Sequence, residues 1–454
     1  MSSSLELSPG HPPILDLSAT VMERQITDAP CGHVLTNGNV WTMAGEWLVY
    51  DVRVTDNFDG TRIERVSVIT GEVELLYESA HGAGCGVATV SPAEPKVVFL
   101  HGPEHPATDW TYGMTRRRGM VIDLRLPRAV RPLDAMNYAP PFAAGALRGG
   151  SHLHMFSPDG ARVSFTYEDE VLERLVAPGP DRDFNRRNIG VAGPGGPVRV
   201  AGTHPRNHHG DWFSVVVTRT VTQPEPGSDD VSRAFDESWI GRDGYVRADG
   251  TRQKRALAFQ GLVTAVEGRQ YPEIFVVDLP DTPMVAGEKG SPIEGTETRY
   301  PAPPPGVSQR RLTFTAGWRF PGVAREPRHW PRSSPDGSRI AFLMLDDASR
   351  PQLWSVGPGT GDLRPISRHP WGVTSAFSWS PNGTHLAHVM DNSVFLTEVA
   401  TGRAARLTGR QNDAMAPLPQ ACVFSPDGRW LAYTRRTDAA GGFPQIFCIA
   451  VPPL

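Results

Sequence analysis

A four-residue turn that recurs along the chain constrains the fold more than any other feature. Its sequence is Ser-Pro-Asp-Gly or Ser-Pro-Asn-Gly, and it occurs at 157–160, 334–337, 380–383 and 425–428, with a degenerate copy at 91–94. Proline presets φ at the second turn position, and Asp-Gly or Asn-Gly accepts the positive φ that a tight hairpin requires. An alternating apolar run follows each complete copy. The sequence therefore predicts a repeated strand–turn–strand unit, which is typical of repeat architectures.

The repeats count to seven units of four strands each. Segment 24–27 resembles the segments that close later repeats as outer strands, whereas the chain ends soon after an expected third strand at 444–450. The N-terminal strand is therefore expected to complete the last sheet, which removes the two exposed edges that an open array would leave unpaired. The prediction is an all-β, seven-bladed β-propeller of four-stranded antiparallel blades over residues 24–454, after a flexible leader at 1–23. A pair of β-sandwiches is the alternative.

Blade four lacks the recurring turn. Gly210-Asp211 is expected to replace it before a strand at 213–220, which would place the channel residue of this blade near His204. The stretch at about 222–270 is then a long insert in blade four. Long loops over one face usually serve binding, so this insert is interpreted either as an aromatic lid for a sugar ring or as a solvated hairpin.

Composition and charge exclude several classes of protein. The chain has 45 Lys and Arg against 49 Asp and Glu, so its net charge of −4 predicts no nucleic-acid partner. No apolar run is long enough to cross a membrane, and no secretory signal pattern begins the chain. The four cysteines lack metal-knuckle spacing. The glycine-rich stretch at 193–197 precedes a strand rather than a helix, which predicts no nucleotide cofactor. A cytoplasmic protein without a membrane partner is expected.

Histidines on the expected inner strands are candidate metal ligands. His152 and His154 are two residues apart on a strand, where their side chains would share one face. His329 and Gln420 occupy corresponding positions on the first strands of blades five and seven. Imidazole and carboxamide groups are suitable ligands for a divalent first-row metal. A polar channel lining without a metal is the alternative.

Arginines and aromatic residues near these positions are candidates for binding and catalysis. Guanidinium forks suit carboxylates, and a base would be needed to remove a proton beside a carboxylate. These considerations predict catalytic roles for His204, Arg328 and Arg148. They predict substrate-binding roles for Arg206, Trp212 and Trp330.

The Ser-Pro-Asp-Gly turn, the apolar strand after it and the run at 274–279 resemble the TolB-like propellers, which include protein-binding propellers and oligogalacturonate lyases. Residues 24–454 resemble the bacterial YidR-like group more closely. In the lyases a His-x-His pair, an upstream glutamine and another histidine hold manganese, which binds the uronate carboxylate. The pair matches His152 and His154, whereas the glutamine falls on Gly149, which cannot ligate.

The resemblance implies a metal-assisted carbon–oxygen lyase that acts on an acidic uronate oligosaccharide by β-elimination. Gly149 removes one ligand of the lyase pattern, which counts against both the predicted metal and the predicted reaction. The alternative is a non-catalytic TolB-like propeller that binds a protein, peptide or sugar on the same face. Repeats of this kind are specific for a fold and a poor guide to activity.

Overall fold

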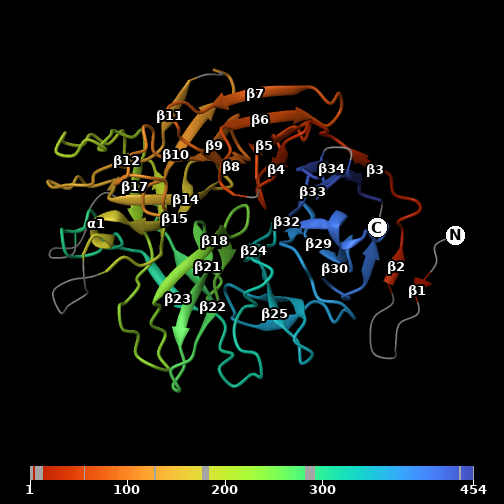
Figure 1. Ribbon diagram of the computed structural model, residues 1–454. Helices are drawn as coiled ribbons and strands as arrows, with labels where there is room; N and C mark the ends of the chain where they lie inside the picture. The colour runs from red at the N-terminus through yellow and green to blue at the C-terminus, as the bar shows by residue number, and fades with distance from the viewer. Residues whose placement is uncertain are drawn as a thin grey trace.

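Seven sheets surround a central axis in the computed structural model (Figure 1). Six of them are four-stranded and antiparallel, and the seventh adds two N-terminal strands to four antiparallel ones. The structure describes residues 4–5, 14–55, 57–126, 129–175, 184–281, 292–438 and 441–452. Each of these seven sheets is one blade, and its strands run outward from the axis in chain order, except that N-terminal strands are outermost in blades six and seven. The predicted seven-bladed β-propeller is confirmed. Among the described residues, no helix is long and apolar enough to cross a membrane.

The first three blades use residues from the N-terminal half of the chain. Their strands are β4 (Gly32–Val34), β5 (Trp47–Arg53), β6 (Arg62–Ser67) and β7 (Val73–Glu78) in blade one, β8 (Cys85–Val90), β9 (Lys96–His101), β10 (Arg118–Asp123) and β11 (Val130–Pro132) in blade two, and β14 (Gly149–Phe156), β15 (Val163–Asp169), β16 (Asn188–Gly193) and β17 (Phe213–Val216) in blade three. The parallel pair β12 (Ala135–Met136) and β13 (Ala146–Leu147) and the short helix α1 (Glu170–Glu173) lie in the connections around blade three.

The other blades continue around the ring. Their strands are β18 (Arg233–Trp239), β21 (Ala256–Thr264), β22 (Gln270–Asp278) and β23 (Ser308–Arg311) in blade four, β24 (Arg332–Ser333), β25 (Ile340–Leu345), β26 (Pro351–Val356) and β27 (Leu363–Pro365) in blade five, β28 (Ser378–Trp379), β29 (His385–Met390), β30 (Ser393–Glu398) and β31 (Ala404–Arg406) in blade six, and β32 (Pro417–Phe424), β33 (Trp430–Arg436) and β34 (Pro444–Ala450) in blade seven. A 3-10 turn, η1 (Asp413–Met415), precedes β32.

An N-terminal strand completes blade seven, as predicted. Strand β3 (Glu23–Gln25) pairs antiparallel with β34, and Gln25 lies opposite Phe447. The ring therefore closes through hydrogen bonds between β3, near the start of the chain, and β34, near its end, which lie side by side (Figure 1). Closure of this kind leaves only short, protected sheet edges.

Part of the segment predicted to be a flexible leader is in the sheet of blade six. Strand β2 (Ile14–Asp16) pairs parallel with β31, and β1 (Ser4–Leu5) pairs antiparallel with β2. The side chain of Ile14 is only 1% exposed and packs against Met390 and Phe395. Burial of an isoleucine stabilises a fold by about 1.5–3 kcal/mol, which accounts for the docking of this strand. Residues 1–3 and 6–13 of the expected leader lie outside the described residues.

The boundary between blades three and four differs from the one expected from the sequence. Strand β17 is the outer strand of blade three, and the inner strand of blade four is β18. The expected insert at 222–270 is the first half of blade four, with a small hairpin of β19 (Tyr245–Val246) and β20 (Arg252–Gln253). The assignment depended on the recurring turn, and blade four has no such turn after its inner strand.

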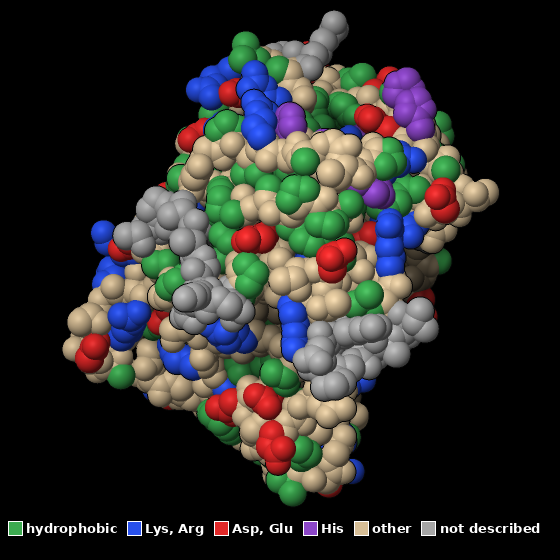
Figure 2. Space-filling view, turned by 90° about the vertical axis from the view of Figure 1, so that its left-hand side faces the viewer, with side chains coloured by type: hydrophobic (Ala, Val, Ile, Leu, Met, Phe, Trp, Pro, Cys, Tyr) green, Lys and Arg blue, Asp and Glu red, His purple; other side chains and the backbone are tan. Residues whose placement is uncertain are grey.

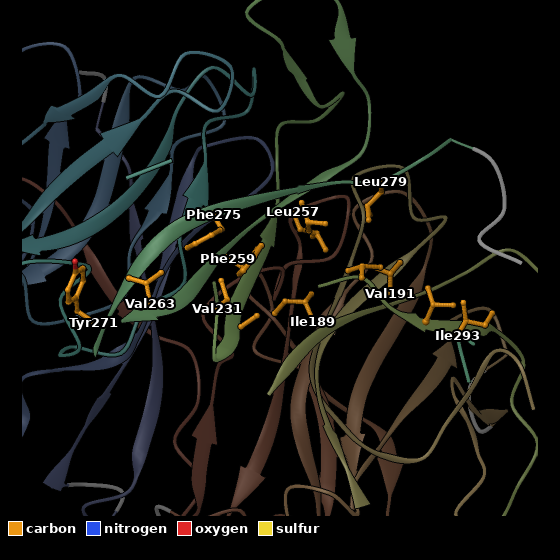
Figure 3. Packing of buried hydrophobic residues seen from close by; sticks show 14 of the residues in the cluster. Ile189, Val191, Val231, Leu257, Phe259, Val263, Tyr271, Phe275, Leu279 and Ile293 are labelled. Carbon is orange, nitrogen blue, oxygen red and sulfur yellow. The ribbon is translucent and has the colours of Figure 1, made fainter. Parts of the chain in front are cut away.

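Hydrophobic side chains fill the spaces between adjacent blades. Figure 3 shows the cluster between blades three and four, where Ile189 and Val191 of β16 lie against Phe259 of β21 and Phe275 of β22. All four side chains are at most 1% exposed. These contacts fix the position of β18 relative to β14, and the candidate site lies along these two strands.

Tryptophans also connect neighbouring inner strands. The indole N–H of Trp239 donates to the carbonyl of Met155 at 3.0 Å, and that of Trp379 donates to the carbonyl of Arg332 at 2.8 Å. Trp41 donates in the same way to Val423 at 3.1 Å. Each bond joins the end of one inner strand to the inner strand of the preceding blade around the ring.

Candidate functional site

A β-bulge separates the two histidines of the His-x-His pair. The pairing of β14 with β15 shifts register between His152 and Met155, and Leu153 has a left-handed φ of 54°. Side chains two residues apart share a face only in a regular strand, so the bulge changes their relative direction. His152 is half-buried, whereas His154 is completely buried. The two imidazoles therefore differ in exposure and direction, although His154 lies near enough to contribute to the lowered pKa of His152.

His154 lies in the interface between blades two and three. Its Nε2 is 3.0 Å from Ser151 Oγ and 3.8 Å from Asp134 Oδ2, and Ser151 Oγ donates to the same carboxylate oxygen at 2.9 Å. A Cβ atom added to Gly119 of β10 would lie 2.7 Å from His154 Nε2, which shows how closely the ring packs on blade two. Solvent does not reach this network, so we assign it a structural role.

The four predicted metal ligands do not fit a manganese centre. Both ring nitrogens of His329 are used, because Nδ1 is 2.8 Å from the carbonyl of Pro327 and Nε2 accepts from the N–H of Leu343 at 3.1 Å. Gln420 is exposed, and His154 lies in a blade interface. No group of three or more His, Cys, Asp or Glu side chains in the described part of the chain is arranged to hold a metal ion.

Arginines instead surround His152. Burial, together with the positive charges of Arg117, Arg328 and Arg187, holds the pKa of His152 well below its ordinary value. The ring is therefore neutral at neutral pH and offers one donor and one acceptor. The neutral imidazole makes no hydrogen bond to the described residues, so both of its nitrogens are available to a ligand.

Two carboxylates hold these arginines at the mouth of the channel. Glu168 Oε1 lies 3.2 Å from a guanidinium nitrogen of Arg187 and 3.9 Å from one of Arg233, and Glu168 Oε2 lies 3.8 Å from Arg117. Asp236 accepts from Arg328 at 2.9 Å. Among the described residues, four guanidinium groups thus share two carboxylates, which leaves a surplus of positive charge beside His152.

Sequence reasoning missed the acidic pair of blade four. Asp236 is the bulged residue of β18, with a φ of 53°, and burial raises its pKa against the opposing charge of Arg328. Glu237 is completely buried, and one of its carboxylate oxygens accepts from Thr166 Oγ1 at 3.0 Å. Burial raises the pKa of Glu237 to about 7.

A sequence signal could have located this pair. An aromatic residue ends the inner strand directly before the turn in blades three, six and seven, at Phe156, Trp379 and Phe424. Trp239 occupies the corresponding position in blade four, and Asp236 and Glu237 lie shortly before it on the same strand. The aromatic residue therefore marks the inner strand of blade four, where the recurring turn is absent.

Two of the predicted residues have mainly structural contacts. Arg148 is completely buried, and its guanidinium donates to Asp169 Oδ2 at 2.6 and 3.1 Å and to the carbonyl of Arg299 at 3.1 Å. Asp169 in turn caps α1, because its side chain accepts from the N–H of Leu172 at 2.9 Å. Trp212 packs edge-on against Phe156, with ring centroids 6.4 Å apart.

The remaining predicted residues divide between two places. The guanidinium of Arg328 is at the mouth, half-exposed, and stacks 4.6 Å from the ring centroid of Trp330, which is nearly buried and supports it. His204 and Arg206 lie in the connection between β16 and β17, beside Trp110. They are not on an inner strand, because the first strand of blade four begins later than expected.

A cavity of about 650 Å³ opens at the opposite end of the channel. The recurring turns of several blades line it together with Trp239, Trp379 and Asn37. Arg332 reaches across from blade five to donate to the carbonyl of Asn37 in blade one at 3.1 Å. Burial lowers the pKa of Arg332 to about 10, so it stays charged at neutral pH.

The fold and the site define a class of protein, a closed seven-bladed β-propeller with arginines around one end of its channel. An oligogalacturonate lyase solved in complex with manganese has the same fold, with a TM-score of 0.54 and 13% sequence identity over all of this chain and 96% of that one. The chain belongs to the family of an Escherichia coli (strain K12) protein described as uncharacterized protein YidR. The two are 44% identical over 414 residues, which cover 90% of this chain and 94% of that protein. The resemblance to the YidR-like group is confirmed.

Three further matches cover parts of the chain. Residues 84–208 match a family described as protein of unknown function, DUF3748, and residues 352–440 match the dipeptidyl peptidase IV N-terminal region. The Tol-Pal system protein TolB of Alcanivorax borkumensis is 33% identical over 94 residues, 20% of this chain and 21% of that protein. All three matches cover less than half of the chain.

Proposed function

We propose that the mouth of the channel binds the carboxylate group of an acidic saccharide of the uronate class. The observation that carries this proposal is the set of four guanidinium groups that share two carboxylates, three of which act on the neutral ring of His152. Guanidinium forks bind carboxylates with two parallel, charge-assisted hydrogen bonds. The name of the oligogalacturonate lyase that shares this fold supports a uronate as the source of the carboxylate.

Metal-free β-elimination is a second candidate, which rests on the neutral His152 beside these arginines. Arginines that neutralise a bound carboxylate acidify the proton on the adjacent carbon. His152 would take that proton, a carbon–carbon double bond would form, and the glycosidic oxygen would leave from the next carbon and be protonated by water. His204, which the sequence predicts to be catalytic, lies beside Trp110 in another pocket, so His152 replaces it as the candidate base.

Calorimetric titration with digalacturonate, using purified protein without a histidine tag, tests the binding proposal. Arg328→Gln and Arg187→Gln each remove a charge-assisted bond worth about 1.5–3 kcal/mol, so affinity should fall about 10- to 100-fold. Arg364→Gln is the matched control, because Arg364 forms an exposed ion pair with Asp362 on blade five. Equal affinity in all three variants, or no binding of digalacturonate, would reject the proposal.

Two further measurements separate binding from turnover. A lyase would release product that absorbs near the unsaturated uronate band, and His152→Ala would abolish this signal. Chelation should leave binding unchanged, since the described residues do not form a metal centre. Binding without product would establish a non-catalytic propeller.

A further inference from the structure

A second polar pocket lies away from the channel, between blades two and three. Its cavity of about 630 Å³ is lined by His105, Asp109, Trp110, Arg116, Arg174, His204, Pro205 and Arg206. These residues come from three separate connections, at 102–117, directly after α1 and at 194–212. Figure 2 shows the side of the molecule on which α1 and β12 lie, where histidine and arginine or lysine side chains gather toward the upper edge.

Three guanidinium groups converge on one indole ring in this pocket. The guanidinium carbons of Arg116, Arg174 and Arg206 lie 4.8, 5.3 and 5.7 Å from the centroid of Trp110. Trp110 is only 6% exposed. The indole therefore serves as the floor under three cations, and all three arginines line the cavity.

Other contacts hold the three arginines before any ligand arrives. Arg116 and Arg174 donate to the same oxygen of the buried Glu170, at 3.1 and 3.0 Å. Arg206 donates to the backbone carbonyls of Glu104 and His105, at 2.6 and 2.9 Å. A site whose donors are already held in place loses less conformational entropy on binding.

Positive charge predominates in the pocket. Glu170 offsets one of the two arginines that it contacts, and the carboxylate of Asp109 also lines the cavity. Arg206 has no carboxylate partner among the described residues, because backbone carbonyls alone accept its bonds. The pocket therefore has a guanidinium whose charge is unbalanced.

His204 adds a directed hydrogen-bond donor. The backbone N–H of Arg206 donates to His204 Nδ1 at 3.1 Å, so the proton of the neutral ring is on Nε2. Burial, with the charges of Arg174 and Arg206, lowers the pKa of His204 and keeps the ring neutral at neutral pH. Its ring also packs at 5.4 Å from Trp110 and 5.5 Å from Tyr138, which fixes its direction.

We propose that this pocket binds an oxyanion, either the carboxylate of an acidic sugar or the phosphate of a phosphate ester, independently of the channel mouth. Arg206 and Arg174 would supply the charge, and His204 Nε2–H would supply one further bond. This assigns to His204 and Arg206 a binding role in a separate pocket, in place of the catalytic and substrate-binding roles that the sequence predicts at the channel.

The test is a titration followed through the indole N–H signal of Trp110 in a nitrogen-15 NMR spectrum, assigned with Trp110→Phe. The probes are inorganic phosphate, glucose 6-phosphate, galacturonate and, as the neutral control, glucose. We expect at least one anion to shift this signal, and glucose to leave it unchanged. The anion that binds more tightly identifies the source of the oxyanion.

Matched variants locate the site. Arg206→Gln and Arg174→Gln should each weaken anion binding by about tenfold or more. Arg206→Lys should weaken it less, because the charge remains while the fork is lost. Arg328→Gln at the channel mouth should leave the Trp110 titration unchanged. No shift with any anion, or the same affinity in Arg206→Gln and the native protein, would overturn the proposal whatever happens at the channel mouth.

Discussion

Blades three and four have the same irregularity in their inner strands and bury different groups with it. Leu153 and Asp236 both have a left-handed φ, of 54° and 53°, at a shift in strand register. In blade three, His152 faces the arginines and His154 enters a blade interface. In blade four, Asp236 contacts Arg328 and Glu237 enters a blade interface. The bulge thus separates neighbouring polar residues into one channel residue and one interface residue.

The two interface residues differ in how well the protein supports them. His154 lies against Ser151 and Asp134, which belong to a network that Ser214 also joins by donating to Asp134 Oδ1 at 2.8 Å. Glu237 has one side-chain donor, Thr166, and its other carboxylate oxygen has no partner among the described residues, whereas the unpartnered atom of His154 is the ring nitrogen Nδ1. An ionised carboxylate is expensive to bury without partners, so the comparison predicts different consequences for the two residues.

Substitution of His154 should have the largest effect. His154→Ala would leave a cavity between blades two and three and remove the ring beside Ser151, so the free energy of unfolding should fall by about 3–4 kcal/mol. Urea unfolding at pH 8 measures this. A fall of less than about 1 kcal/mol in the free energy of unfolding would show that His154 does not support the interface. The contrast drawn between His154 and Glu237 would then be wrong.

Substitution of Glu237 should change the pH dependence of stability. Its pKa rises from 4.5 to about 7 on folding, so the folded state favours the protonated form. The resulting stability is complete below about pH 4.5 and is lost as the pH rises through about 7, on the order of 3 kcal/mol in total.

Glu237→Gln keeps the shape and removes the titration. The variant should therefore match the native protein near pH 5 and exceed it in stability at pH 8. Unfolding curves at the two pH values measure the difference, with Glu267→Gln as the control because Glu267 is well exposed. If the native protein and Glu237→Gln lose stability equally between pH 5 and pH 8, Glu237 is charged throughout and the contrast with His154 is wrong.

The sequence was sufficient to predict most of the architecture. Turns at 157–160, 334–337, 380–383 and 425–428 each mark the end of an inner strand, and their local chemistry determines the hairpin. The closing strand was also predictable, because the chain ends after three strands of blade seven and an outer-strand pattern is left over at residues 24–27. Blade four was not predictable from the turn, since Trp239 is followed by a connection that carries its own hairpin.

The site was less predictable, for a physical reason at Leu153. A leucine strongly disfavours the left-handed region, so no local signal announces the bulge that separates His152 from His154. The surroundings of His329 were also not predictable from the sequence. Backbone groups that only the folded blade brings near occupy both of its ring nitrogens. Arg117, Arg187 and Arg233 lie near strand ends in three blades, and the closed ring alone brings them together.

Substitution of His152 should have the smallest effect on stability, and it sharpens the comparison most directly. His152 is two residues from His154 on the same strand, but it is half-buried and makes no hydrogen bond to the described residues. His152→Ala should therefore change the free energy of unfolding at pH 8 by less than about 0.5 kcal/mol. Its pKa is depressed in the folded state, so the native protein should lose stability as the pH falls through 6.5, and the variant should lose less.

Paired unfolding curves for His152→Ala and His154→Ala at pH 8 and pH 5 measure both effects. Equal destabilisation by the two substitutions at pH 8 would mean that the bulge does not divide channel from interface, and His152 would then be a structural residue rather than part of a binding site.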